Sequence, residues 1–136
     1  MRQNKWGILI FAFIEIFIGT VTLVAVVASL IQGRSTKPLE VVIFVLTTAI
    51  IAINLGIGIL LRNLTSYNLL IYFSSIIILS KILIFGKIMV LNGALETTIP
   101  SSIKNVISII YHGLLIFYFK QKPIRELFYK EASITK

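Results

Sequence analysis

The chain has 136 residues, of which 57% are hydrophobic and only 13% are charged. A typical soluble domain has about 25% charged residues, and one of this size could not bury so much apolar surface, so the composition excludes a soluble globular protein. The sequence has no cysteine, which excludes disulfides, thiolate metal sites and a cysteine nucleophile. We therefore predict an integral membrane protein.

The formal net charge of the chain is +8. On a soluble protein such a charge would indicate nucleic-acid binding. Here the basic residues lie mostly at the ends of apolar stretches and in the C-terminal tail, where anionic headgroups and the positive-inside rule account for them. We expect the lipid bilayer as a partner and no nucleic acid.

The first apolar stretch, residues 6–30, is long enough to cross a bilayer, which takes about 20 residues. It is longer than the roughly 7–15 apolar residues of a signal peptide, so we expect a retained helix. A carboxylate in the middle of a span costs about 3 kcal/mol, so Glu15 should face protein or water. At helical spacing it lies on one stripe with small and polar residues, namely Ala12, Gly19, Thr22 and Ser29.

Three further spans are expected at residues 41–61, 67–88 and 103–119. Aromatic residues near the span ends, such as Tyr67 and Phe119, are expected at the membrane interface. The second span contains small residues that would let a neighbouring backbone approach closely, namely Ala52, Gly56 and Gly58.

Residues 120–136 follow as a basic tail. In it Ile124, Leu127 and Phe128 repeat at i, i+3 and i+4 after Pro123, which predicts a short amphipathic helix on the membrane surface. The predicted fold is an all-α membrane protein: an antiparallel four-helix transmembrane bundle with a short amphipathic C-terminal tail, in which residues 1–136 form a single domain.

The distribution of Lys and Arg predicts the orientation. With both termini inside, eight of these residues lie on the cytoplasmic side, namely Arg2, Lys5, Arg62, Lys120, Lys122, Arg125, Lys130 and Lys136. Four lie outside, namely Arg34, Lys37, Lys87 and Lys104. We expect both termini in the cytoplasm and a prokaryotic cytoplasmic membrane as the location.

The depth of polar residues along each span predicts a polar layer inside the membrane. Glu15 lies ~13 Å from the cytoplasmic end of its span, and Asn54 and His112 lie ~12 Å from the corresponding ends of theirs. Ser74 and Ser75 lie at a similar depth on the third span. All four spans would then contribute polar groups to one level.

Three readings of this layer stay open. The polar groups could bond to one another and fix the helix register, since such contacts are worth about 0.6–2 kcal/mol each in membranes. Glu15 and His112 could instead form a proton- or cation-responsive site, or Glu15 could face another subunit. Ser108 is a secondary candidate on the stripe of His112. Lys81 is expected to extend to the outer interface on its long stem in preference to pairing with Glu15.

The C-terminal stretch 109–128 has an aromatic helix end, then basic residues and Pro123, and a charged turn that ends in Phe128. In these features it resembles small uncharacterised four-helix membrane proteins of bacteria. The resemblance implies the same topology and no particular activity.

Glu15 is followed by Gly19 and Thr20 in the first of four short spans. This arrangement is similar to that of the small multidrug resistance exporters, in which a Glu of the first helix exchanges protons for cationic drugs. The resemblance implies a proton-coupling role for Glu15 and extends to no other residue.

The sequence contains no nucleophile–base set, phosphate-binding loop, haem-ligand pair or metal cluster, so we expect no enzyme activity, cofactor or metal. We predict a non-catalytic membrane subunit that packs against other membrane proteins or against copies of itself and stabilises a complex. The alternative is a small oligomeric proton-coupled transporter or channel that uses Glu15. A protein that binds a lipid or quinone between its helices is a third class.

Overall fold

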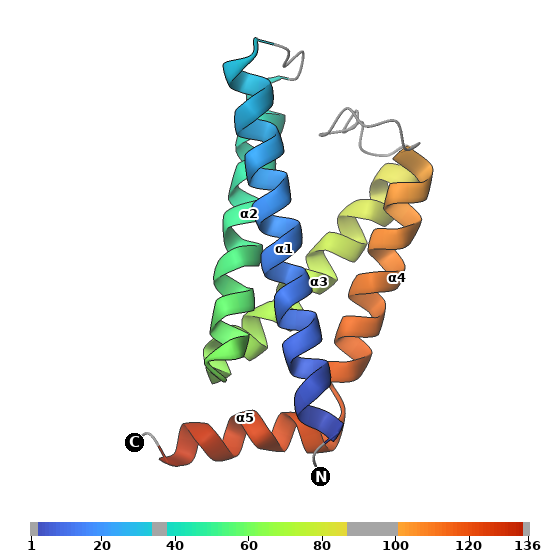
Figure 1. The fold of residues 1–136 in the computed structure, drawn as a ribbon. Coiled ribbons are helices and arrows are strands. Elements are labelled where there is room, and N and C mark those ends of the chain that lie inside the picture. Colours follow the sequence, from blue (N-terminus) through green and yellow to red (C-terminus); the bar gives the residue numbers. More distant parts are fainter. Residues whose placement is uncertain (1–2, 34–37, 87–100, 135–136) are drawn as a thin grey trace.

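The computed structural model describes residues 3–33, 38–86 and 101–134. These residues form five α-helices and no strand (Figure 1), namely α1 (Gln3–Ile31), α2 (Leu39–Leu60), α3 (Leu64–Phe85), α4 (Ser101–Phe119) and α5 (Lys122–Ile134). The first four are long and apolar enough to cross a membrane. The predicted all-helical class with four membrane-length helices is therefore confirmed. The last predicted residues of the third span, 87–88, and of the tail, 135–136, lie outside the described residues.

Helices α1 and α2 lie side by side and form the closest helix pair (Figure 1). Two glycines bring their backbones together. A Cβ added to Gly19 would lie 2.7 Å from the carbonyl oxygen of Ala49, and one added to Gly56 would lie 2.9 Å from that of Ala12. Gly58 serves a different contact, because a Cβ there would meet the Ser66 side chain on α3.

Helices α3 and α4 form the second pair. In Figure 1 the two pairs lie close together at the end that carries the chain termini and diverge toward the opposite end. Helix α5 lies across the end where the pairs meet. The arrangement therefore has one closed end, and most of the outer faces of the four long helices are exposed.

The turn between α2 and α3 is held by its own residues and by α5. Arg62 adopts a left-handed conformation, with φ of 54°, and ends α2. Asn63 then caps α3, because its Oδ1 accepts a hydrogen bond of 2.8 Å from the backbone N–H of Thr65. The Arg62 guanidinium also lies 2.7 Å from a carboxylate oxygen of Glu131, which connects this turn to α5.

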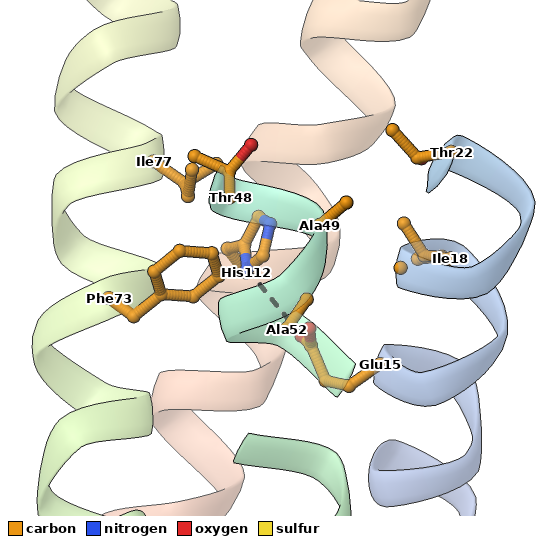
Figure 2. A pocket seen from close by; sticks show the side chains of 10 residues that line it. Glu15, Ile18, Thr22, Thr48, Ala49, Ala52, Phe73, Ile77 and His112 are labelled. Atoms are coloured by element: carbon orange, nitrogen blue, oxygen red, sulfur yellow. Dashed lines mark ion pairs between the residues drawn. The ribbon is translucent and has the colours of Figure 1, made fainter. Parts of the chain in front are cut away.

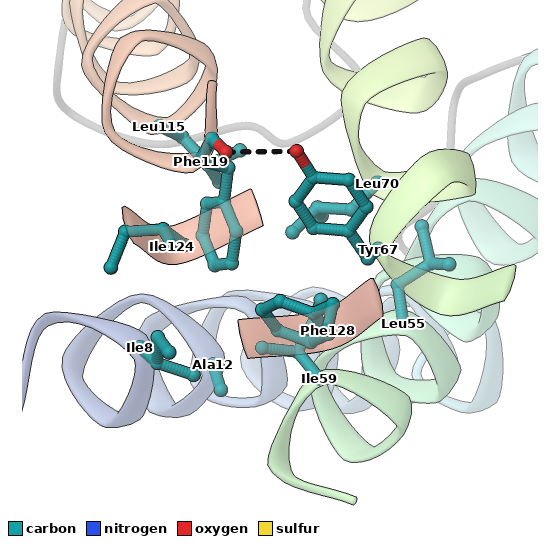
Figure 3. Close-up of a cluster of buried hydrophobic side chains, with 10 residues drawn as sticks. All are labelled: Ile8, Ala12, Leu55, Ile59, Tyr67, Leu70, Leu115, Phe119, Ile124 and Phe128. Carbon is teal, nitrogen blue, oxygen red and sulfur yellow. Dashed lines mark hydrogen bonds between the residues drawn. The ribbon is translucent and has the colours of Figure 1, made fainter. Parts of the chain in front are cut away.

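A hydrophobic cluster fills the closed end (Figure 3). Its members come from all five helices, namely Ile8, Ala12, Leu55, Ile59, Tyr67, Leu70, Leu115, Phe119, Ile124 and Phe128. Inside it the Tyr67 hydroxyl donates a hydrogen bond of 2.9 Å to the carbonyl oxygen of Phe119, and the Tyr67 ring stacks on Phe128 at 4.8 Å between centroids. This hydrogen bond satisfies a carbonyl at the C-terminal end of α4, where helices leave acceptors free.

The cluster corrects the placement expected for two aromatic residues. Tyr67 and Phe119 were predicted at the membrane interface, but both are buried within the protein. The reason is α5, whose Ile124 and Phe128 pack over them, while most of its charged residues remain exposed. The apolar face of α5 is therefore covered at these two positions by the protein itself.

The packing of α5 predicts that mutating two isoleucines of that helix will have different effects on stability. Ile124 is fully buried, whereas Ile134 is 74% exposed. We expect Ile124→Ala to lower the free energy of unfolding by about 2–5 kcal/mol, since it leaves a cavity in the cluster. Ile134→Ala makes the same chemical change at an exposed site and should cost about 0.5 kcal/mol or less. Thermal unfolding of both variants in mild detergent measures the difference, and equal effects would contradict the role of α5 in the core.

Candidate functional site

Glu15 lies on the face of α1 that packs against the other helices, and its side chain is only 2% exposed. Ala12 and Gly19, about one turn away on either side, make the backbone contacts with α2 that fix this face. The Tyr111 hydroxyl of α4 donates a hydrogen bond of 3.1 Å to Glu15 Oε1. The carboxylate is thus enclosed by protein at a depth where lipid contact would be costly.

His112, the next residue on α4, connects Glu15 to α3. Its Nδ1 lies 4.0 Å from Glu15 Oε1 and 3.3 Å from the Ser74 hydroxyl oxygen. The contact with Glu15 is an ion pair when the imidazole is protonated, and the imidazole and the hydroxyl can exchange donor and acceptor roles. We call Glu15, Ser74, Tyr111 and His112 the polar cluster; it joins α1, α3 and α4.

A pocket of about 110 Å³ borders the polar cluster (Figure 2). It has room for a few water molecules. All four long helices line it, with Glu15, Ile18, Gly19, Thr22, Thr48, Ala49, Ala52, Phe73, Ile77 and His112. In Figure 2 the side chains of Glu15 and His112 point toward each other. The two threonine hydroxyls and the Glu15–His112 pair are its polar elements, and the rest of the lining is apolar.

Two residues predicted for the polar layer do not belong to it. Asn54 is exposed on α2, and its side-chain amide donates to the carbonyl oxygen of Ile50 at 2.9 Å. Ser75 is exposed on α3, and its hydroxyl donates to the carbonyl oxygen of Ile71 at 2.8 Å. Successive helical residues point about 100° apart, and on α3 it is Ser74 that is buried while Ser75 faces outward. The prediction was based on the depth of each residue along its helix, and depth does not determine the direction in which a side chain points.

The two secondary candidates, Lys81 and Ser108, lie near the polar cluster. The described residues show no hydrogen bond between either of them and the cluster. Lys81 is half-buried on α3, close enough to His112 and Lys104 to interact with both electrostatically. No ion pair joins Lys81 to Glu15 in the described part of the chain. Ser108 is half-buried on α4, about one turn before His112.

Tyr111 is the member of the polar cluster that the sequence reasoning missed. A tyrosine in an apolar span fits equally well as a packing residue, and its aromatic neighbours suggest the same. The signal that points to it is its place beside His112, at the depth of Glu15, with a hydroxyl that needs a partner inside a membrane.

Potential metal ligands are sparse. Among the described residues no group of three or more His, Asp or Glu side chains could hold a metal ion. What the polar cluster offers is one carboxylate, one imidazole and two hydroxyls, which suit hydrogen bonding and proton exchange.

The hydrogen bond between Tyr111 and Glu15 predicts a measurable coupling. We expect Tyr111→Phe to destabilise the protein in detergent by about 0.6–2 kcal/mol, as is usual for polar contacts between membrane helices. Tyr72→Phe is the matched control, since Tyr72 is 68% exposed, and should have no effect. In a Glu15→Ala background Tyr111→Phe should cost much less than in the wild type. An equal cost in both backgrounds would show that the two side chains are not coupled.

Comparison with protein-family models, with curated proteins and with solved structures finds no match for this chain. The two resemblances drawn from the sequence therefore stay predictions. Any function proposed for the chain rests on its own geometry.

Proposed function

We propose that the protein is a non-catalytic integral membrane subunit that packs against other membrane proteins or against copies of itself and stabilises a membrane complex. The observation that carries this proposal is the enclosure of Glu15. Its carboxylate is buried, accepts a hydrogen bond from Tyr111 and faces His112, which in turn contacts Ser74. A polar group partnered within the chain in this way fixes the positions of helices, which is what a structural subunit requires.

The proposed topology is an antiparallel four-helix transmembrane bundle with both termini in the cytoplasm of a prokaryotic cell. The excess of Lys and Arg on that side supports it. Helix α5 supports it too, since Lys122, Arg125 and Lys130 are exposed and suited to anionic headgroups of the inner leaflet. Arg34, Lys37 and Lys87, assigned to the opposite side, lie outside the described residues.

The topology can be tested with single cysteines, because the chain has none of its own. We expect Ser35→Cys, in the segment between α1 and α2, to react with a membrane-impermeant maleimide added to intact cells. Ser133→Cys, which places an exposed thiol on α5, should react only after the membrane is opened. Labelling of Ser133→Cys in intact cells would contradict the proposed orientation.

A small oligomeric proton-coupled transporter or channel is the second candidate function, and the pocket favours it. The pocket borders Glu15 and His112 and is lined by all four long helices. A carboxylate beside such a space could exchange protons with water that enters it. The pocket is small and mostly apolar, so the structural role remains the main proposal.

Two experiments distinguish these functions. The first isolates the protein from its native membrane in mild detergent, and the second changes Glu15. For a structural subunit we expect stoichiometric assembly with other chains or with itself. Glu15→Gln should leave the yield of that assembly within about twofold of wild type, since the amide oxygen still accepts from Tyr111. A strictly monomeric protein in both detergent and membrane would contradict this proposal. Loss of proton-coupled flux in reconstituted Glu15→Gln, with folding intact, would favour the transporter.

A further inference from the structure

The outward face of α2 carries an unbroken stripe of exposed residues. Going along the helix, the stripe consists of Ile43, Thr47, Ile50, Asn54, Ile57 and, at the end of the helix, Leu61. The spacing alternates between four and three residues, so these side chains form one seam. Any outward helix face repeats in this way. What distinguishes the stripe is the carboxamide of Asn54 in a surface that is otherwise almost wholly apolar.

The side chain of Asn54 has hydrogen-bonding groups without a partner among the described residues, and lipid tails cannot provide one. It lies ~12 Å along the helix from Arg62, near the middle of a hydrocarbon layer about 30 Å thick. One amide N–H bonds to the Ile50 carbonyl, and the described residues give Asn54 no other hydrogen bond. A carboxamide has a second N–H and a carbonyl oxygen, which therefore remain available.

Two serines of α3, one exposed and one half-buried, show how a polar side chain avoids this cost. Ser75 and Ser80 each donate their single O–H to a carbonyl one turn earlier, at 2.8 Å. A hydroxyl used in this way has no donor left, so such a serine can face lipid. Asn54 makes the same kind of bond and still has one donor and one acceptor, which costs free energy in an apolar medium unless a polar partner meets it.

One donor and one acceptor on the same group are self-complementary. Copies of one chain enter the membrane in one orientation, so their α2 helices run parallel and place Asn54 at the same depth. About a two-fold axis, the N–H of each Asn54 would meet the carbonyl oxygen of the other. From residue 43 to residue 61 the stripe contains no charged residue, so identical faces meet without repulsion.

We infer that the outward stripe of α2 is the docking face for a second copy of this chain, with the two Asn54 side chains paired at its centre. This inference rests on the proposed function as a subunit, and it names the partner. A different protein would need to present a polar group at the same depth, whereas a second copy does so by symmetry.

Disulfide cross-linking of single-cysteine variants in native membranes tests the contact. Ile50 and Ile51 have the same chemistry and the same depth and are 49% and 38% exposed, but only Ile50 lies on the stripe. We expect Ile50→Cys and Ile57→Cys to give a cross-linked dimer on oxidation, and Ile51→Cys to give far less. Equal cross-linking at residues 50 and 51, or none at residues 50 and 57, overturns the inference.

A second measurement concerns the role of the amide. We expect Asn54→Leu to weaken dimer formation in mild detergent by about 3- to 30-fold, the usual range for one polar contact between membrane helices. At protein concentrations too low for dimer formation its thermal unfolding should match that of the wild type, because the Asn54 side chain bonds only within α2. Asn54→Gln, which keeps the carboxamide, should retain more of the dimer than Asn54→Leu. An unchanged dimer in Asn54→Leu overturns the pairing.

The outcomes also separate this inference from the proposed function. Stoichiometric assembly with other proteins, without cross-linking through the stripe, overturns the second copy as partner and leaves the subunit role in place. A protein that is monomeric in the membrane and in detergent overturns both.

Discussion

A carboxylate in the middle of a membrane helix has to be surrounded by protein, and in this chain α4 meets that requirement. Tyr111 donates to Glu15, and His112 lies between Glu15 and Ser74. Two pairs of helices that diverge toward one end are thereby linked across the space between them. The glycine contacts between α1 and α2 hold Glu15 in position for this link. The pocket lies beside this link and is lined by residues of both pairs.

Much of the fold could be predicted, because its signals extend over many residues. The length and apolar character of four stretches indicate the spans. The face of α1 that carries Glu15 could be predicted as well, since Ala12 and Gly19 repeat around it and small residues mark close backbone approach. The directions of Asn54 and Ser75 could not, because depth along a helix is independent of rotation about its axis. That rotation depends on contacts with helices distant in the sequence.

The burial of the aromatic residues at the closed end could not be predicted for the same reason. Tyr67 and Phe119 lie near span ends, where a tyrosine or phenylalanine suits both the interface and a protein core. Packing against Phe128 places them in the core, and Phe128 is more than 60 residues from Tyr67 in the chain. The spacing of apolar residues in α5 indicates that one face will be covered, but it carries no information about what covers it.

The position of α5 after the four apolar helices also matters during synthesis. Those helices can enter the membrane one after another as the ribosome makes them, with their backbone hydrogen bonds already satisfied. The hydrophobic cluster, however, includes Ile124 and Phe128, and the turn between α2 and α3 contacts Glu131. Neither contact can form until α5 has emerged from the ribosome. A chain cut short after α4 would lack these residues, and the end where its helices meet would be left uncovered.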